Sequence, residues 1–284
     1  MTDNFFSVFG EKLNIYLEMA NNLISDYKMY KYFISSQDAF ESLGIKDMNF
    51  VYWFEIIERC HYSSYTALKR QLSWIQGILN GFSNNNYLSF CANFRGFLLS
   101  SADILYSFQA ISISLAENNE QIILSLNNQL DSVLMASTEL ENLLIHFTHA
   151  RKVDKNEHNV PSIHQAKSDR NYLEVFKTEN VSKCYEELCQ ITHPAKNTID
   201  NFISYYENDK DIKLDFNKDE KNINGFIKKY EDCFPEIFSS FNVIFLLMKV
   251  INLLKVEDYH SESIEKYNLT NIPLYNRICG YFKK

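Results

Sequence analysis

Apolar residues recur every three to four positions along most of the chain, which is the spacing of one face of an α-helix. Near the N-terminus, for example, Phe5, Phe9, Leu13 and Tyr16 follow this pattern. The pattern predicts helices at about 4–33, 50–79, 87–116, 128–151, 166–177, 181–192, 197–206, 222–230, 236–255 and 274–282.

Polar segments separate these helices. Gly81 and the run 83–86 end the second helix, 117–120 is a polar break, and 152–166 is a polar loop that contains Pro161. The charged strip 207–219 reads as a surface loop and as a weak candidate boundary between domains. Residues 212–216 within it alternate between apolar and polar, which predicts a short strand or hairpin near 211–216.

The composition agrees with long helices packed around a sizeable core. The chain has 284 residues, 46% of them hydrophobic, but only 7 Gly and 4 Pro. Chains made of β-strands use these two residue types in frequent turns, so their scarcity favours helices. We expect an all-α fold, an irregular multi-helix bundle formed by a single domain over 1–284.

Charge and hydropathy point to a cytoplasmic protein without a membrane partner. The N-terminus lacks the basic region and long apolar stretch of a signal peptide. The most apolar segment, 237–254, is interrupted by Ser, Asn and Lys residues, which predicts a buried helix. The net charge of −8 disfavours non-specific coating of nucleic acid. None of the six cysteines forms a C-x-x-C pair, as expected of reduced thiols.

Titratable residues gather where the predicted helix 128–151 ends. His146, His149, His158 and His164 fall within 19 residues of one another. Basic residues flank them and a further histidine follows, namely Arg151, Lys152, Lys167, Arg170 and His193. An imidazole can accept or donate a proton near neutral pH, and a guanidinium can bind a phosphate with two hydrogen bonds. Cleavage of a ribose–phosphate backbone needs both kinds of group and no metal.

Six residues separate Arg151 from His158, a spacing that agrees with the loose Arg-x(4–6)-His signature of the HEPN group of helical ribonucleases. The segments 93–97, 140–152, 164–167 and 185–195 also resemble a set of bacterial helical proteins, HEPN-like and associated with phage defence. The similarity covers about residues 85–200.

This resemblance implies a helical effector that cleaves RNA without a metal or other cofactor, in bacterial defence or in a toxin system. Its site would often be composite across a dimer, so we expect a homo-oligomer or a partner protein. Catalysis would fall to Arg151 and to one or more of the histidines His146, His149, His158 and His193. RNA would be bound by Arg95, Lys152, Lys167 and Arg170.

Each of these residues also has a structural interpretation. Arg95 lies in an apolar stretch, where a charge needs a partner such as Glu141 or Asp103. His193 precedes Pro194 and can end its helix. His146 and His149 can line a bundle with satisfied ring nitrogens.

Two other functions compete with RNA cleavage. His146 and His149 lie on one helical face and, with Glu139, Glu141 or His164, could bind zinc or iron. The second alternative is a non-enzymatic helical protein, an accessory or sensor subunit that binds a partner. The acidic charge favours this alternative, whereas the clustered histidines and basic residues favour the nuclease.

Overall fold

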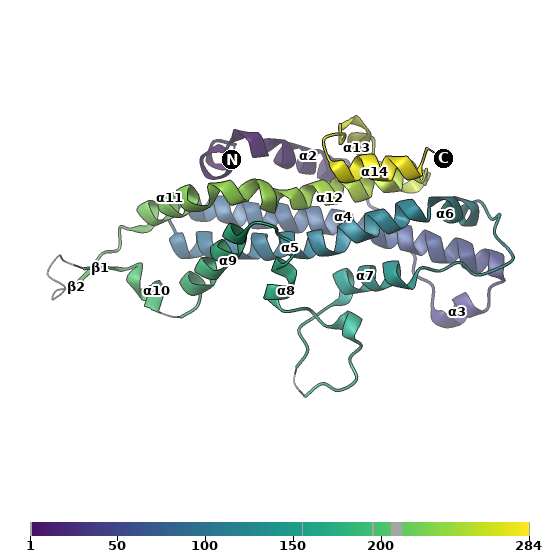
Figure 1. Ribbon diagram of the computed structural model, residues 1–284, viewed down its shortest axis with the longest axis horizontal. Helices are drawn as coiled ribbons and strands as arrows, with labels where there is room; N and C mark the ends of the chain where they lie inside the picture. The colour runs from purple at the N-terminus through teal and green to yellow at the C-terminus, as the bar shows by residue number, and fades with distance from the viewer. Residues whose placement is uncertain (1, 155, 195, 206–211, 284) are drawn as a thin grey trace. The chain divides into compact units, whose positions relative to one another are not determined.

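The computed structural model describes residues 2–154, 156–194, 196–205 and 212–283. It confirms an all-α, multi-helix protein (Figure 1). The α-helices are α1 (Thr2–Phe9), α2 (Asn14–Ser25), α3 (Gln37–Glu41), α4 (Ile45–Ser83), α5 (Tyr87–Glu117), α6 (Asn119–Leu126), α7 (Thr138–His149), α8 (Asp169–Leu173), α9 (Glu179–Thr192), α10 (Lys196–Asp200), α11 (Asp219–Tyr230), α12 (Phe234–Leu253), α13 (Glu262–Lys266) and α14 (Pro273–Tyr281). Short 3₁₀ turns are η1 (Glu11–Leu13), η2 (Ser162–His164), η3 (Glu231–Cys233) and η4 (Glu257–Tyr259).

The chain forms two compact units, each built from three separate segments. The first unit comprises Met1–Glu18, Lys69–Ala102 and Asp169–Ser240, and the second comprises Met19–Leu68, Asp103–Ser168 and Phe241–Lys284. The helices α2, α4, α5 and α12 each contribute to both units. The expectation of a single domain stays a prediction.

Phenylalanine rings fill the core of the first unit. The ring of Phe9 in α1 lies 5.0 Å from that of Phe238 and 5.5 Å from that of Phe234, both in α12. Phe94 in α5 contacts Phe234 at 5.4 Å and Phe226 of α11 at 5.5 Å. Such tilted and edge-on contacts add to the free energy of burial. The apolar spacing of the sequence therefore marked the residues that hold these helices together.

The core of the second unit is built on the first part of α4. Trp53, Ile57 and Cys60 are fully buried there or nearly so. Phe108 of α5 packs its ring 4.6 Å from that of Phe147 in α7, and so helps to attach α7 to the unit. The helix that carries His146 and His149 is thus held by its apolar face.

The predicted first helix, 4–33, is wrong in its second half. The chain turns at Gly10, which adopts a left-handed φ of 81°, and α2 ends at Ser25. Residues 28–36 are not helical. The backbone N–H groups of Phe33 and Ser35 donate instead to the carboxylates of Glu58 and Glu55. These α4 side chains replace the carbonyl partners that a helix would supply.

The predicted helix 128–151 begins ten residues late, at Thr138. In the preceding segment the side chain of Asn49 donates to the carbonyls of Leu130 and Val133 and accepts from the N–H of Met135. Asn128 has a left-handed φ of 55°, which ends α6. Side chains of α4 therefore supply backbone partners to this segment in place of helical ones.

The short strand predicted near 211–216 is confirmed as part of a hairpin. Strand β1 (Ile203–Tyr205) pairs antiparallel with β2 (Ile212–Leu214), with Ser204 opposite Lys213. The predicted helix 197–206 is shorter, because α10 ends at Asp200 and β1 follows. Residue 206 of that predicted helix and residues 207–211 of the predicted loop 207–219 lie outside the described residues.

Two helical stretches of the described chain are long and apolar enough to cross a membrane, Tyr87–Glu117 and Asp219–Leu253. In their most apolar windows 56% and 78% of the residues are buried inside the structure. A core helix is apolar on all sides and meets the same criterion, so the finding has little weight by itself.

Two glycine substitutions test the close approach of α4 and α5 in the first unit. A Cβ atom at Gly81 would lie 2.6 Å from the backbone nitrogen of Phe90, whereas one at Gly225 in α11 meets nothing within 4 Å. We expect Gly81→Ala to lower the free energy of unfolding by about 1–3 kcal/mol through overpacking. Gly225→Ala should raise it by roughly 1 kcal/mol through helix propensity. Urea denaturation measures both, and equal effects of the two variants would contradict the packing.

Candidate functional site

The candidate site lies where α7 ends, and a long loop returns there. The N–H of Arg151 donates to the carbonyl of His164 at 3.0 Å, and the N–H of Ala166 donates to the carbonyl of Arg151 at 2.9 Å. These bonds form a parallel bridge between Arg151 and Gln165. Figure 1 shows the loop leaving α7 and coming back to it. The bridge places a residue from the far end of the loop beside the last turn of α7.

This closure brings two imidazoles together on the surface of the second unit. The rings of His149 and His164 have centroids 6.0 Å apart. His149 is exposed and His164 is half-buried. Two rings at this separation can contact different oxygens of one phosphate group. The sequence pattern placed His164 in the histidine cluster but did not single it out as catalytic.

Hydrogen bonds orient the ring of His149. The hydroxyl of Thr148 donates to the carbonyl of Leu144 at 2.7 Å and lies 2.6 Å from Nδ1 of His149. This bond fixes the direction of the ring in either tautomer, with Nδ1 as the donor or as the acceptor. It engages Nδ1, so Nε2 is the ring nitrogen that it leaves for a substrate.

His146 has a different environment, although it lies on the same helix. It is only 7% exposed, and its Nδ1 lies 3.2 Å from the carbonyl oxygen of Ile163 in the returning loop. The ring of Tyr106 packs edge-on against it, with centroids 5.8 Å apart. His146 therefore ties the loop to α7 from the buried side.

The guanidinium of Arg151 forms a two-pronged ion pair with Glu157 inside the same loop. Nη1 donates to Oε1 at 2.9 Å and Nη2 donates to Oε2. The hydrogen bonds from Arg151, and then one from the N–H of Asp154, lower the pKa of Glu157 to about 2. Glu157 and Arg151 both lie in solvent, where such a pair exchanges readily for another anion.

The other predicted residues of this unit lie around the loop. Lys152 and His158 are exposed on it. Lys167 donates from Nζ to the hydroxyl of Tyr106, and its ammonium lies 4.0 Å from the centroid of that ring. Lys167 thus contacts the same tyrosine, Tyr106, that packs on His146.

Three predicted residues belong to the first unit, and one of them forms a cluster of its own. Nη2 of Arg95 lies 3.6 Å from a carboxylate oxygen of Asp169 and 3.5 Å from the hydroxyl of Tyr185. The Tyr185 hydroxyl also donates to Asp169. Arg95 thus has partners that the sequence pattern did not name.

The other two are surface residues of the same unit. Arg170 is exposed on α8. His193 is the C-cap residue of α9, where its N–H donates to the carbonyl of Cys189 at 2.9 Å, and its side chain is exposed. The expected end of the helix at His193 is confirmed.

Comparisons with family models, with curated proteins and with solved structures found no match for this chain. Within the described residues, no group of three or more His, Cys, Asp or Glu side chains is placed to hold a metal ion. The alternative of a zinc or iron site at His146 and His149 therefore has no ligand set among them.

The second unit contains a buried polar cluster that the sequence pattern did not predict. Glu58, only 2% exposed, accepts from the N–H of Phe33 at 3.1 Å and from the hydroxyl of Tyr259 at 2.6 Å. One turn on, His61 is 1% exposed and its Nδ1 lies 2.8 Å from the hydroxyl of Tyr32. The available signal was a Glu and a His three residues apart on the apolar face of a helix, where polar groups need partners.

Burial lowers the pKa of His61 from its ordinary 6.5 to about 4. Below pH 6.5 the unfolded chain binds a proton at this residue that the folded chain does not, so acid favours unfolding. We expect the free energy of unfolding to fall by about 3 kcal/mol between pH 6.5 and pH 4 because of this group.

Urea denaturation of the wild type and of His61→Phe at pH 7, 5.5 and 4.5 measures the effect. The variant should lose less stability than the wild type over this range. An identical fall in both proteins would show that His61 is not buried as a neutral ring. His158→Phe, at an exposed position, is the matched control and should leave the pH dependence unchanged.

Proposed function

We propose that this protein is a HEPN-like, metal-independent ribonuclease, an effector of bacterial defence or of a toxin system. The observation that carries the proposal is the pair of accessible imidazoles, His149 and His164, whose rings lie 6.0 Å apart. Cleavage of RNA by its own 2′-hydroxyl needs one group that removes a proton and one that donates a proton.

In this proposal His149 is the base and His164 is the acid, because the bond at Nδ1 leaves Nε2 of His149 for the substrate. In the tautomer that carries its proton on Nδ1, the Nε2 lone pair takes the proton of the 2′-hydroxyl as the oxygen attacks phosphorus. His164, in its protonated form, gives a proton to the 5′-oxygen as the bond from phosphorus to that oxygen breaks. A 2′,3′-cyclic phosphate and a free 5′-hydroxyl result, so atoms and charge balance.

Basic residues next to the pair hold the phosphate in this proposal. Arg151 follows His149 by two positions, and Lys152 extends the positive charge along the loop. The Arg151–Glu157 pair keeps the guanidinium oriented until RNA takes the place of Glu157. A bidentate contact to phosphate offsets the charge that develops in the transition state.

The buried ring of His146 positions the loop in this account, because it joins α7 to Ile163 next to His164. Arg95, Lys167 and Arg170 remain candidates for RNA contacts, and His158 and His193 for catalysis. Self-association is part of the same proposal, since a dimer would double the basic surface offered to one RNA strand.

Incubation of the purified protein with a fluorescent single-stranded RNA in EDTA tests the proposal. We expect cleavage that leaves 2′,3′-cyclic phosphate ends. His149→Gln and His164→Gln should each lower the rate by about 10²–10⁴-fold, the usual contribution of a general acid or base. His260→Gln, an exposed histidine elsewhere in the second unit, is the matched control and should retain full activity.

Glu157→Gln distinguishes an Arg151 that binds RNA from one that only stabilises its loop. Loss of the carboxylate frees the guanidinium, so RNA should bind more tightly to Glu157→Gln and less tightly to Arg151→Ala. RNA that stays intact in EDTA, or cleavage that persists in the double variant of His149 and His164, would contradict the proposed nuclease activity.

A second function, a non-enzymatic accessory or sensor protein, is supported by one observation. Both oxygens of Glu157 accept hydrogen bonds from the Arg151 guanidinium, as expected where an arginine only stabilises its loop. Under this alternative, Glu157→Gln loosens the loop and leaves RNA affinity unchanged.

A further inference from the structure

A hollow of about 600 Å³ lies in the second unit, away from the histidine pair in sequence. One wall is the segment that follows α2, with Asp26, Lys28 and Tyr30. The opposite wall is the stretch from η4 to α13, with His260 and Lys266. This volume is in the range of sites for small molecules.

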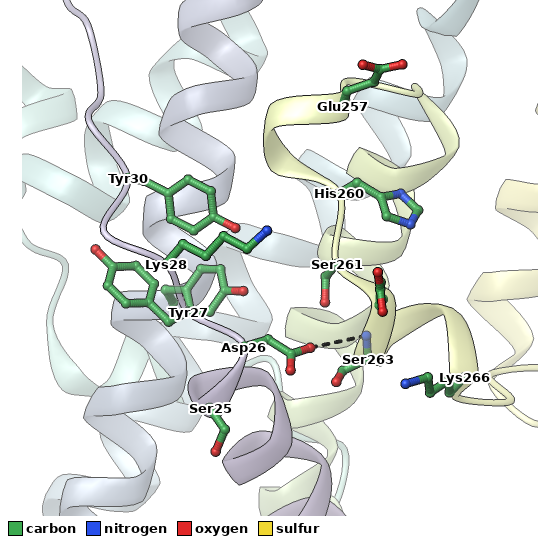
Figure 2. A pocket seen from close by; sticks show the side chains of 12 residues that line it. Ser25, Asp26, Tyr27, Lys28, Tyr30, Glu257, His260, Ser261, Ser263 and Lys266 are labelled. Carbon is green, nitrogen blue, oxygen red and sulfur yellow. Dashed lines mark hydrogen bonds between the residues drawn. The ribbon is translucent and has the colours of Figure 1, made fainter.

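One hydrogen bond joins the two walls, and α12 holds one wall in place, so the hollow is formed without a ligand. The N–H of Ser263 donates to the carboxylate of Asp26 at 3.2 Å, as drawn in Figure 2. The side chain of Asn252 in α12 binds Ser261 twice: its Nδ2 donates to the Ser261 carbonyl at 2.9 Å, and its Oδ1 accepts from the Ser261 N–H at 3.0 Å. A site that is ordered in advance loses less freedom when it binds.

Two lysines face the hollow without an acidic partner. Figure 2 shows Lys28 and Lys266 with their ammonium groups turned toward it from opposite walls. Among the described residues, neither ammonium forms an ion pair, whereas the nearby Lys249 is paired with Glu265. Two such ammonium groups favour a ligand that carries negative charge.

The ring of Tyr30 gives the hollow an aromatic face. Tyr65, which is only 6% exposed, lies beside it with its ring tilted by 39°. Both rings pack on the buried ring of His61, with centroids 4.6 and 5.0 Å away, and this contact holds Tyr30 in place. A planar ring of a ligand can stack on Tyr30.

Carboxylates restrict the ligand further. Asp26, Glu257 and Glu262 line the same hollow and repel a compact polyanion such as pyrophosphate. A ligand that offers hydroxyl or amino donors beside its anionic group satisfies them instead. The three kinds of lining group therefore call for an anion, a planar ring and hydrogen-bond donors in one small molecule.

We propose that this hollow, the Lys28–Lys266 site, binds a nucleoside monophosphate. Its phosphate lies between the two ammonium groups, its base lies on Tyr30, and its ribose hydroxyls donate to the carboxylates. The site is independent of the proposed RNA cleavage, since none of its residues lies in the loop of His149 and His164.

Calorimetric titration of the full chain with AMP, GMP, CMP and UMP tests this site. We expect saturable binding of at least one of them, and at least 10-fold weaker binding of the matching nucleoside and of inorganic phosphate. Lys28→Ala and Lys266→Ala should each weaken binding at least 10-fold, and both positions are exposed, so folding is retained.

Lys31→Ala is the matched control, because Lys31 is exposed on the same segment and does not line the hollow; its affinity should equal that of the wild type. The double variant of His149 and His164 should also bind normally, which separates this site from the RNA site. Three results would overturn the proposal: no saturable binding of any monophosphate, unchanged affinity of the two lysine variants, or tighter binding of L-tryptophan, an anion with a planar ring but no phosphate or ribose.

Discussion

The two backbone hydrogen bonds that join Arg151 to His164 and Ala166 are the constraint on which the account of this protein depends. They close a polar loop of low hydrophobicity that has little core of its own. Without them His164 would have no fixed relation to His149, and Arg151 would have no fixed direction. Because each bond is an ordinary amide contact, the closure also needs the buried anchor of His146 on Ile163.

The same principle shapes the rest of the second unit. Non-helical segments lie against long helices because side chains of α4 satisfy their backbones, Glu55 and Glu58 for the segment after α2 and Asn49 for the segment before α7. The segment after α2 also forms one wall of the Lys28–Lys266 site. Polar groups of one helix thus position both the hollow and the helix that carries the histidine pair.

The sequence was most informative where apolar spacing decides the structure. It predicted α5, α9 and the strand β2 closely, because their apolar positions meet a core or a partner strand. It missed the non-helical run after Ser25 and the late start of α7, since their backbone partners are Glu55, Glu58 and Asn49, far away in the chain. The histidine cluster was visible in the sequence, but the choice of His164 as the partner of His149 required the loop to close.

Histidine NMR tests the central claim most directly, because it observes both rings at once. The protein, labelled with ¹³C at its histidine rings, would be titrated with an RNA dinucleotide whose attacking 2′-hydroxyl is replaced by hydrogen, so that it binds without being cleaved. The account predicts that the signals of His149 and His164 shift together with one saturation curve. A shift of only one of them, or of neither, would contradict it.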